Sequence, residues 1–392
     1  MVTRRRGIVR PAAMAGLVTG LALAAATATP SASAGQPGSR AQGGRAAEAG
    51  AAAARTTVTV ARLPGPVKLT WTLRQAIQYL PPSNHSQYLV VIASRHDAWF
   101  FGGSNLAGHG VPEVLRRFRG GFRFPALPSG LHSWIAAASA QSPSNIWAVT
   151  YLGGAVLRWN GTAWKTVPRG AWRAGTQFTG IDAVGPRSVW LFGGRGRSFA
   201  GAGSWHWDST GWTRVRGIAG GIRQGSAVSA RDIWAIGGIG GSLNALFQLS
   251  GGTWRHVTPG PLAGFSYSYV LALAPGNVWV AGSVSGVPKL AHFDGSAWTR
   301  LTMPGSVAAT GICRNGRGGL WVVANSGTGH SILRQRSAAG HWSTTTVSAS
   351  SANEVLACTL VPGGQAAWGA GKSAGVGGHG SAAAVYGYGS LP

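Results

Sequence analysis

The chain has 392 residues and a formal charge of +26, because 34 lysines and arginines stand against only eight acids. Eight acids leave few candidates for the paired carboxylates of hydrolytic mechanisms. The positive excess favours polyanionic partners such as nucleic acid, wall polymers or acidic glycans, although it would also keep a secreted protein from aggregating. Abundant glycine (63 residues) and tryptophan (18 residues) suit strands joined by tight turns, with large aromatics packed between sheets.

Residues 1–34 resemble a signal peptide for export. Arginines precede a largely apolar run over residues 12–26, and the small residues 32–34 (Ala-Ser-Ala) provide a cleavage site before Gly35. The run is too short and too rich in Ala, Gly and Thr for a membrane anchor. A pair of arginines at positions 5 and 6 is similar to a twin-arginine signal, so that route and the general secretory route both stay open. We therefore expect a secreted or envelope-associated monomer without a transmembrane anchor.

Residues 35–55 have the composition of a linker. They are mainly Gln, Gly, Ser, Ala, Pro and Arg with one acid, Glu48, and they show no apolar periodicity. Such a composition cannot bury enough apolar surface to fold, so we expect this segment to be disordered.

Tryptophan recurs along the rest of the chain at intervals of 42 to 48 residues. The repeated residues are Trp99, Trp147, Trp190, Trp234, Trp279, Trp321 and Trp368. A period of about 40 to 50 residues built from short strands is typical of β-propellers, with one blade per repeat. In the clearest repeat, strands are expected over residues 178–184, 189–192, 204–207 and 212–215. The sequence therefore predicts an all-β, seven-bladed β-propeller of four-stranded antiparallel blades over residues 56–392.

The repeats resemble the kelch repeat, in which an apolar strand ends in Gly-Gly, an aromatic lies in the third strand and a Trp opens the fourth. The matching residues here include Gly193, Gly194, Trp207 and Trp212. The short hairpin at residues 208–211 is similar to the Asp-box (BNR) turn of sialidase-type propellers. The resemblance covers roughly residues 88–390 and implies a secreted bacterial propeller fold without implying a ligand. The Gly-Gly pair is degraded in two repeats, and the hairpin is shorter than in kelch proteins.

The last repeat ends at a third strand and lacks a fourth. An incomplete blade would leave exposed strand edges, so the missing strand is expected from the N-terminal side of the array. Residues 56–61 are the first candidate because they alternate regularly. Residues 68–73 are the second, since Trp71 precedes Trp99 by about the usual hairpin-to-strand interval.

Most acids occupy turn positions. Asp97 and Asp232 stand two residues before a repeat tryptophan, where other repeats carry Asn or Ser, and Asp208 and Asp294 occupy the hairpin between the third and fourth strands. Interchange with Asn and Ser predicts hydrogen-bond acceptors in turns instead of proton donors. The acids outside these positions and the linker are Glu113, Asp182 and Glu354. They supply no repeated carboxylate pair, so we expect no glycosidase site.

Cys313 and Cys358 fall in the first strands of successive repeats. Export favours a disulfide between them. They precede Trp321 and Trp368 by 8 and 10 residues. Because both spacings are even, the two cysteines should point to the same side of their blades, unless the intervening turns differ in length. No histidine pair has the spacing of metal ligands, and neither cysteine has the context of a copper site. We therefore predict no metal and no cofactor.

Arginines gather in loops that should share one face of the ring. In a propeller, the loops joining second and third strands emerge together with the connections between blades. The predicted binding residues in these loops are Arg169, Trp172, Arg173, Arg195, Arg197, Arg216 and Arg223, with Phe199, Tyr267 and Tyr269 beside them. Arginines interleaved with aromatics suit phosphate, sulfate, carboxylate or sugar-ring contacts. The alternative is a solvated basic rim.

The sequence thus predicts a binding or interaction module at or outside the cell envelope, with an anionic polymer or an envelope protein as its partner. The alternative function is that of an extracellular propeller enzyme, a lyase or hydrolase, whose site would lie in loops.

Overall fold

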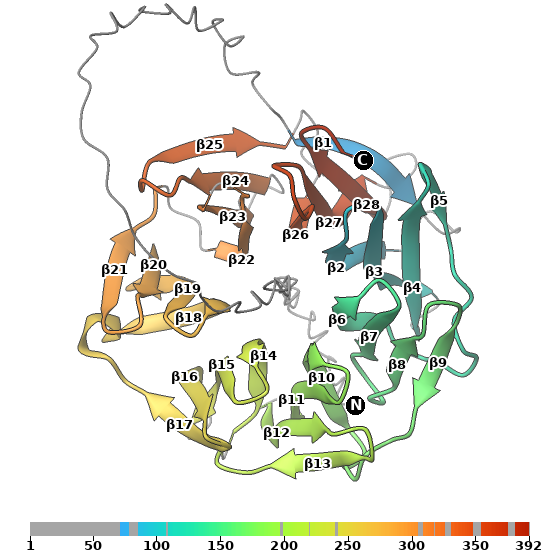
Figure 1. Cartoon of the computed structure of the whole chain (residues 1–392), viewed down its shortest axis with the longest axis horizontal. Helices are drawn as coiled ribbons and strands as arrows, with labels where there is room; N and C mark the ends of the chain where they lie inside the picture. The colour runs from blue at the N-terminus through green and yellow to red at the C-terminus, as the bar shows by residue number, and fades with distance from the viewer. Residues whose placement is uncertain are drawn as a thin grey trace, which may run out of the picture. The chain divides into compact units, whose positions relative to one another are not determined.

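The computed structural model describes residues 71–77, 85–106, 109–196, 199–218, 220–239, 242–304, 309–316, 318–325, 331–347, 354–374 and 381–391. They form a ring of seven blades, each a four-stranded antiparallel sheet, which confirms the predicted fold (Figure 1). The export signal (1–34) and the linker (35–55) lie outside the described residues. No helix in the described segments is long and apolar enough to cross a membrane.

Each blade runs from a first strand near the centre of the ring to a fourth strand at its outer edge (Figure 1). The first strands are β2 (His85–Ala93), β6 (Ile135–Ser142), β10 (Thr176–Gly185), β14 (Ile222–Ser229), β18 (Phe265–Ala274), β22 (Ala309–Arg314) and β26 (Glu354–Leu360). The second strands are β3 (Asp97–Leu106), β7 (Asn145–Thr150), β11 (Ser188–Arg195), β15 (Asp232–Ile239), β19 (Asn277–Val284), β23 (Leu320–Asn325) and β27 (Ala367–Ala374).

The outer halves of the blades follow the same order. The third strands are β4 (His109–Phe118), β8 (Val156–Trp159), β12 (Ala200–Trp207), β16 (Ser242–Ser250), β20 (Val287–Phe293), β24 (Ser331–Arg336) and β28 (Ser381–Tyr388). The fourth strands are β5 (Gly121–Arg123), β9 (Trp164–Val167), β13 (Trp212–Val215), β17 (Thr253–Val257), β21 (Trp298–Thr302), β25 (Trp342–Thr346) and β1 (Trp71–Ile77). A 3-10 turn, η1 (Gly260–Leu262), precedes the fifth blade.

The seventh blade takes its fourth strand from the N-terminal side of the array, as expected. β1 runs antiparallel to β28, with Trp71 opposite Tyr388. Other fourth strands open with a tryptophan at the same place, such as Trp212 opposite Trp207. Trp71 therefore supplies the aromatic that the blade lacks. The closing strand begins inside the second candidate segment and extends beyond it, so it is not the first candidate, residues 56–61, which lie outside the described residues.

The repeated tryptophans are buried between blades, and polar side chains hold several of them in place. Asn277 accepts hydrogen bonds from Trp279 Nε1 (2.9 Å) and from His292 (3.0 Å), whose ring stacks on the indole at 4.1 Å. In the first blade Asp97 instead accepts from Arg116, whose guanidinium lies over the Trp99 ring. The residue two places before each of these tryptophans is thus an acceptor, as its interchange with Asn predicted.

The hairpins between third and fourth strands share one hydrogen-bond pattern. Asp208 Oδ1 accepts from the N–H and hydroxyl of Thr210 and from the Gly211 N–H, at 2.6 to 3.1 Å. Asn160 and Asp294 accept the same three bonds in their own hairpins. The two aspartates and the asparagine therefore fix turns.

Side chains on the first strands link neighbouring blades. Ser139 on β6 donates to Asp182 on β10 (3.2 Å) and accepts from the Ala183 N–H (2.9 Å). Asp182 in turn accepts from the Ala227 N–H on β14 (2.6 Å). Three blades are thereby joined through one buried carboxyl group.

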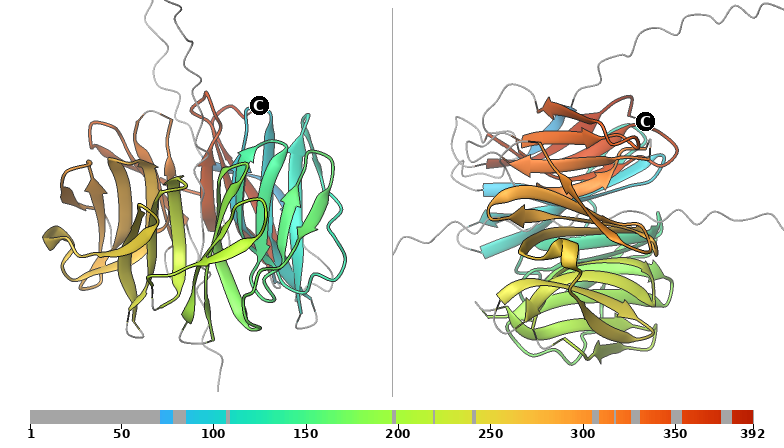
Figure 2. Two further views of the ribbon diagram at one scale, coloured as in Figure 1. Left: turned by 60° about the horizontal axis from the view of Figure 1, so that its bottom comes forward. Right: turned by 90° about the vertical axis from the view of Figure 1, so that its left-hand side faces the viewer.

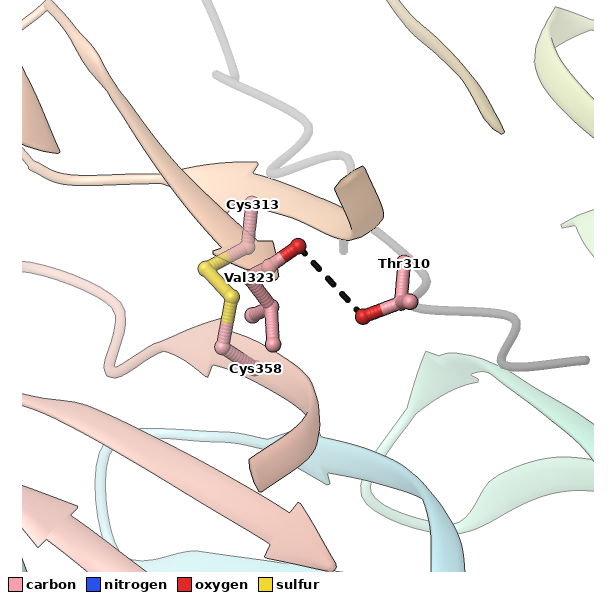
Figure 3. The surroundings of a disulfide bond; sticks show 4 residues. All are labelled: Thr310, Cys313, Val323 and Cys358. Atoms are coloured by element: carbon pink, nitrogen blue, oxygen red, sulfur yellow. Dashed lines mark hydrogen bonds between the residues drawn. A yellow bond between two sulfur atoms is a disulfide. The ribbon is translucent and has the colours of Figure 1, made fainter. Parts of the chain in front are cut away.

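A disulfide joins the first strands of the sixth and seventh blades (Figure 3). The Cα atoms of Cys313 and Cys358 are 5.8 Å apart, and beside the bond the Thr310 hydroxyl donates to the Val323 carbonyl. Cys313 lies opposite Trp321, whereas Cys358 lies opposite the residue after Trp368. The two turns differ in length and shift the register by one residue, so the shared parity of the spacings does not keep the sulfur atoms apart.

Candidate anion-binding site

The two faces of the ring carry different kinds of connection, visible at the two edges of the blades in Figure 2. One face holds the tight turns between first and second strands and between third and fourth strands, for example residues 208–211. We call it the turn face. The other face holds the loops between second and third strands and the connections between blades, for example residues 168–175 and 285–286. We call it the arginine face because the predicted binding residues lie on it.

A cleft of about 340 Å³ lies on the arginine face at the third blade. Its lining includes Trp172, Arg173, Thr176, Arg195, Trp205 and Arg214. The structure thus brings together three of the predicted binding residues, Trp172, Arg173 and Arg195. It adds a third guanidinium, that of Arg214. The arginines come from the connection before β10, from the end of β11 and from β13.

Local backbone geometry places Arg173 beside Arg195. Thr176 lies opposite Arg195 in the pairing of β10 with β11. Its hydroxyl donates to the Arg173 carbonyl at 2.8 Å, and its N–H donates to the same carbonyl at 3.3 Å. Gly175 completes this turn with a positive φ of 75°, which glycine adopts without strain. The turn therefore fixes the first arginine against the strand end that carries the second.

Arg214 was missed by the sequence analysis. It sits on the short fourth strand β13, opposite Trp205, and its Nη2 donates to the Gly201 carbonyl at 2.8 Å. The predicted binding residues come from loops, whereas Arg214 lies with Thr213 at the exposed centre of the strand β13. The run of exposed residues on an outer strand is the signal that would have identified it.

Trp172 forms the floor of the cleft. It is 5% exposed and makes edge-to-face contacts with Phe178, Trp205 and Trp212 at centroid distances of 5.1 to 5.9 Å. Arg169 donates to its carbonyl at 3.1 Å. Most of the Trp172 side chain is therefore packed against other aromatics, and the ligand contact that the sequence predicts for it stays a prediction.

The remaining predicted residues lie outside the cleft. Arg223 on β14 donates to the Tyr267 carbonyl on β18, and burial lowers the pKa of its guanidinium. Arg216 is exposed on the connection that follows β13. Arg197 lies outside the described residues, and Tyr269 is buried. The predicted residues therefore separate into those that line the cleft and Arg223, whose half-buried side chain links two first strands.

The described acids are distributed unevenly between the faces. Asp97, Asp208, Asp232 and Asp294 lie on the turn face, at turns or at the strand starts beside them. On the arginine face the described segments hold Glu354, which pairs with Lys372 at 3.4 Å. Among the described residues that line the cleft there is no carboxylate. Its positive charge is therefore available to a ligand.

Glu113 and Asp182 are buried away from the cleft. Burial raises the pKa of Glu113 to about 7, and this carboxyl accepts a 2.6 Å hydrogen bond from the Tyr88 hydroxyl. Burial also raises the pKa of Asp182 to about 7. Within the described segments, no group of three or more His, Cys, Asp or Glu side chains is placed to hold a metal ion.

A second cavity of about 440 Å³ lies on the turn face between the fifth, sixth and seventh blades, lined in part by Asn277, Arg314 and Leu360. Arg314 donates to the Leu273 carbonyl at 3.1 Å, and burial lowers the pKa of its guanidinium. Among the described residues that line this cavity, Arg314 is the one arginine, and its guanidinium is engaged with backbone.

Comparison with known proteins supports the fold. No protein-family model and no curated protein matches the chain. Among solved structures, YCF48 bound to D1 peptide has a TM-score of 0.55 and 16% identity, covering 82% of this chain and 97% of that one. Inactive virginiamycin B lyase from Staphylococcus aureus with quinupristin has a TM-score of 0.59 and 11% identity, covering 82% and 100%.

The xyloglucanase of Xanthomonas campestris is a third similar structure, with a TM-score of 0.56 and 15% identity. The match covers 80% of this chain and 53% of that protein. The three proteins share a propeller and differ in what they bind. This chain is therefore a generic propeller module, and its function has to be argued from its own site.

Proposed function

We propose that this chain is an exported binding module whose arginine face holds an anionic group of an envelope polymer. One observation carries the proposal. Arg173, Arg195 and Arg214 line one cleft, and none of the described residues that line it is a carboxylate. Paired guanidiniums favour planar, doubly bonded contacts to carboxylate, phosphate or sulfate.

The support beneath the cleft fits a binding role. The Arg214 guanidinium is held by the Gly201 carbonyl, and the backbone of Arg173 is held by the turn that Thr176 closes. A side chain that is already held in place, as that of Arg214 is, loses less conformational entropy when a ligand binds. Trp172 and Trp205 also line the cleft and add aromatic surface to it.

Export is part of the proposal. The signal-like residues 1–34 and the linker 35–55 are expectations from the sequence, and so is the kelch-like or Asp-box-like character of the repeats. The disulfide fits an oxidising compartment. The extracellular domain of BT4673 from B. thetaiotaomicron is a similar structure, which is compatible with this location.

Retention on a carboxylated or phosphorylated matrix across a salt series tests the proposal. Replacing Arg173 and Arg195 with Ser should lower the eluting salt concentration and reduce the slope of log affinity against log salt by about 1 to 2. The matched control replaces Arg187 and Arg231, exposed arginines of the turn face, and should change retention little. Equal losses of retention in the cleft variant and the control variant would mean that the effect comes from net charge alone. Unchanged retention of the cleft variant would point to the linker arginines Arg40, Arg45 and Arg55.

A further inference from the structure

Three of the five exposed large apolar side chains in the described segments occupy the same place in their blades. Leu152, Ile239 and Val287 are 48%, 43% and 50% exposed. Each lies at the loop between the second and third strands, in the second, fourth and fifth blades respectively. The other two, Leu73 and Phe124, belong to or follow outer strands.

The third blade carries Arg195 at the equivalent loop. Along the arc from the second to the fifth blade, the loop tips of the arginine face therefore present Leu, Arg, Ile and Val in turn. The cleft lies within this arc, flanked by apolar tips on both sides. The exposed aspartates of the described segments lie on the turn face, so the apolar tips and the uncompensated positive charge share one side of the ring.

The spacing of the apolar tips distinguishes between possible partners. A protein interface has a contiguous apolar core surrounded by a polar rim, whereas these three side chains stand on separate blades. The boundary between lipid headgroups and acyl chains accepts isolated apolar side chains that reach it at one level. Anionic lipids would add attraction to the basic face.

We propose that the arginine face docks on an anionic lipid surface, with Leu152, Ile239 and Val287 entering the headgroup boundary and the cleft arginines contacting lipid phosphate. The phosphate contact rests on the proposed anion-binding function. The apolar contact is independent of it. The cleft that is proposed to hold an anionic group of an envelope polymer then also accepts headgroup phosphate, and the loop tips set the orientation of the ring on the membrane.

Co-sedimentation with vesicles tests the docking. The protein is the chain from Gly35 onward, which keeps every described strand and removes the apolar leader. Binding should be strong to vesicles with half phosphatidylglycerol and weak to pure phosphatidylcholine. Replacing Leu152, Ile239 and Val287 with Ser should weaken phosphatidylglycerol binding at least about 10-fold and leave retention on the soluble-polymer matrix unchanged. Ser at Leu73 and Phe124 is the matched control and should bind vesicles as the parent does.

The outcomes separate this proposal from the one it extends. If the tip variant melts like the parent and still binds vesicles equally well, the docking is wrong whatever the matrix shows. A second outcome is that the tip variant loses vesicle binding while the double variant Arg173→Ser, Arg195→Ser keeps both vesicle and matrix binding. The lipid-phosphate contact and the proposed anion-binding function are then both wrong. Vesicle binding by pure phosphatidylcholine as strong as by the anionic mixture would also overturn the docking, since it would show no role for charge.

Discussion

Burial decides what each aspartate does in this propeller. Asp208 is fully exposed in its hairpin, and the hydrogen bonds from Thr210 and Gly211 lower its pKa to about 2. Asp182 is buried between first strands, and the loss of hydration raises its pKa to about 7 despite its hydrogen bonds to Ala227 and Ser139. The same residue type thus stabilises a turn as an anion and a blade junction as a neutral acid.

Asp182→Asn should change how stability depends on pH. Between about pH 4 and 7 the folded state retains a proton on Asp182 that the unfolded chain releases. The contribution of Asp182 to the free energy of unfolding is therefore present below about pH 4 and is lost as the pH rises through about 7. Urea unfolding from pH 4 to 8 should show the parent losing roughly 2–4 kcal/mol relative to the variant.

Asp232→Asn is the control, because this acid lies on the turn face and accepts from Gln248. It should follow the parent through the same range. His206 and His292, whose pKa values are lowered by burial, act in the opposite direction in parent and variant alike. The difference between the stability curves of the parent and of Asp182→Asn therefore isolates Asp182. Parallel curves for these two proteins would contradict the protonation of Asp182 in the folded state.

At the scale of the strand, neighbouring blades are held together by side chains of the first strands. Hydrogen bonds do this between β6, β10 and β14, and the disulfide does it between β22 and β26. The strands themselves were predictable, since alternation and turn residues are local signals. The links between them depend on register, which the lengths of the intervening turns decide.

Removing the disulfide should lower stability without changing the fold. The bond closes a 45-residue segment, so its loss should reduce the free energy of unfolding by roughly 2–4 kcal/mol, mainly because the unfolded chain gains freedom. Urea unfolding of the parent with and without reductant measures this loss. A variant with Ala at both Cys313 and Cys358 should have the same free energy of unfolding as the reduced parent, and reductant should not change it. An effect of reductant on that variant would show that the loss has another origin.

At the scale of the whole molecule, the ring closes through a contact between its two ends. β1 pairs with β28, and the Trp71 ring lies 5.7 Å from Trp321 and 5.5 Å from Tyr388. A buried tryptophan removed from such a seam costs about 3–5 kcal/mol. Without β1, the last blade would also expose the hydrogen-bonding edge of β28.

Deleting residues 35–77 should therefore abolish cooperative thermal unfolding, because it removes the closing strand. Deleting residues 35–65 is the matched control. It removes residues 56–61 but keeps β1, and we expect it to melt as the parent does. A cooperative melt at the parent temperature after the longer deletion would mean that β1 does not close the ring. Loss of folding after the shorter deletion would instead show that the first candidate segment is needed.

The sequence by itself determined the features whose signals repeat locally. The tryptophan period, the strand alternation and the Asx turns predicted seven four-stranded blades and the shared face of the arginine loops. Only the tertiary structure decided which strand closes the ring and that Arg214 joins Arg173 and Arg195. It also decided that Trp172 packs inward. These outcomes depend on contacts between residues distant along the chain, and such contacts leave no period in the sequence.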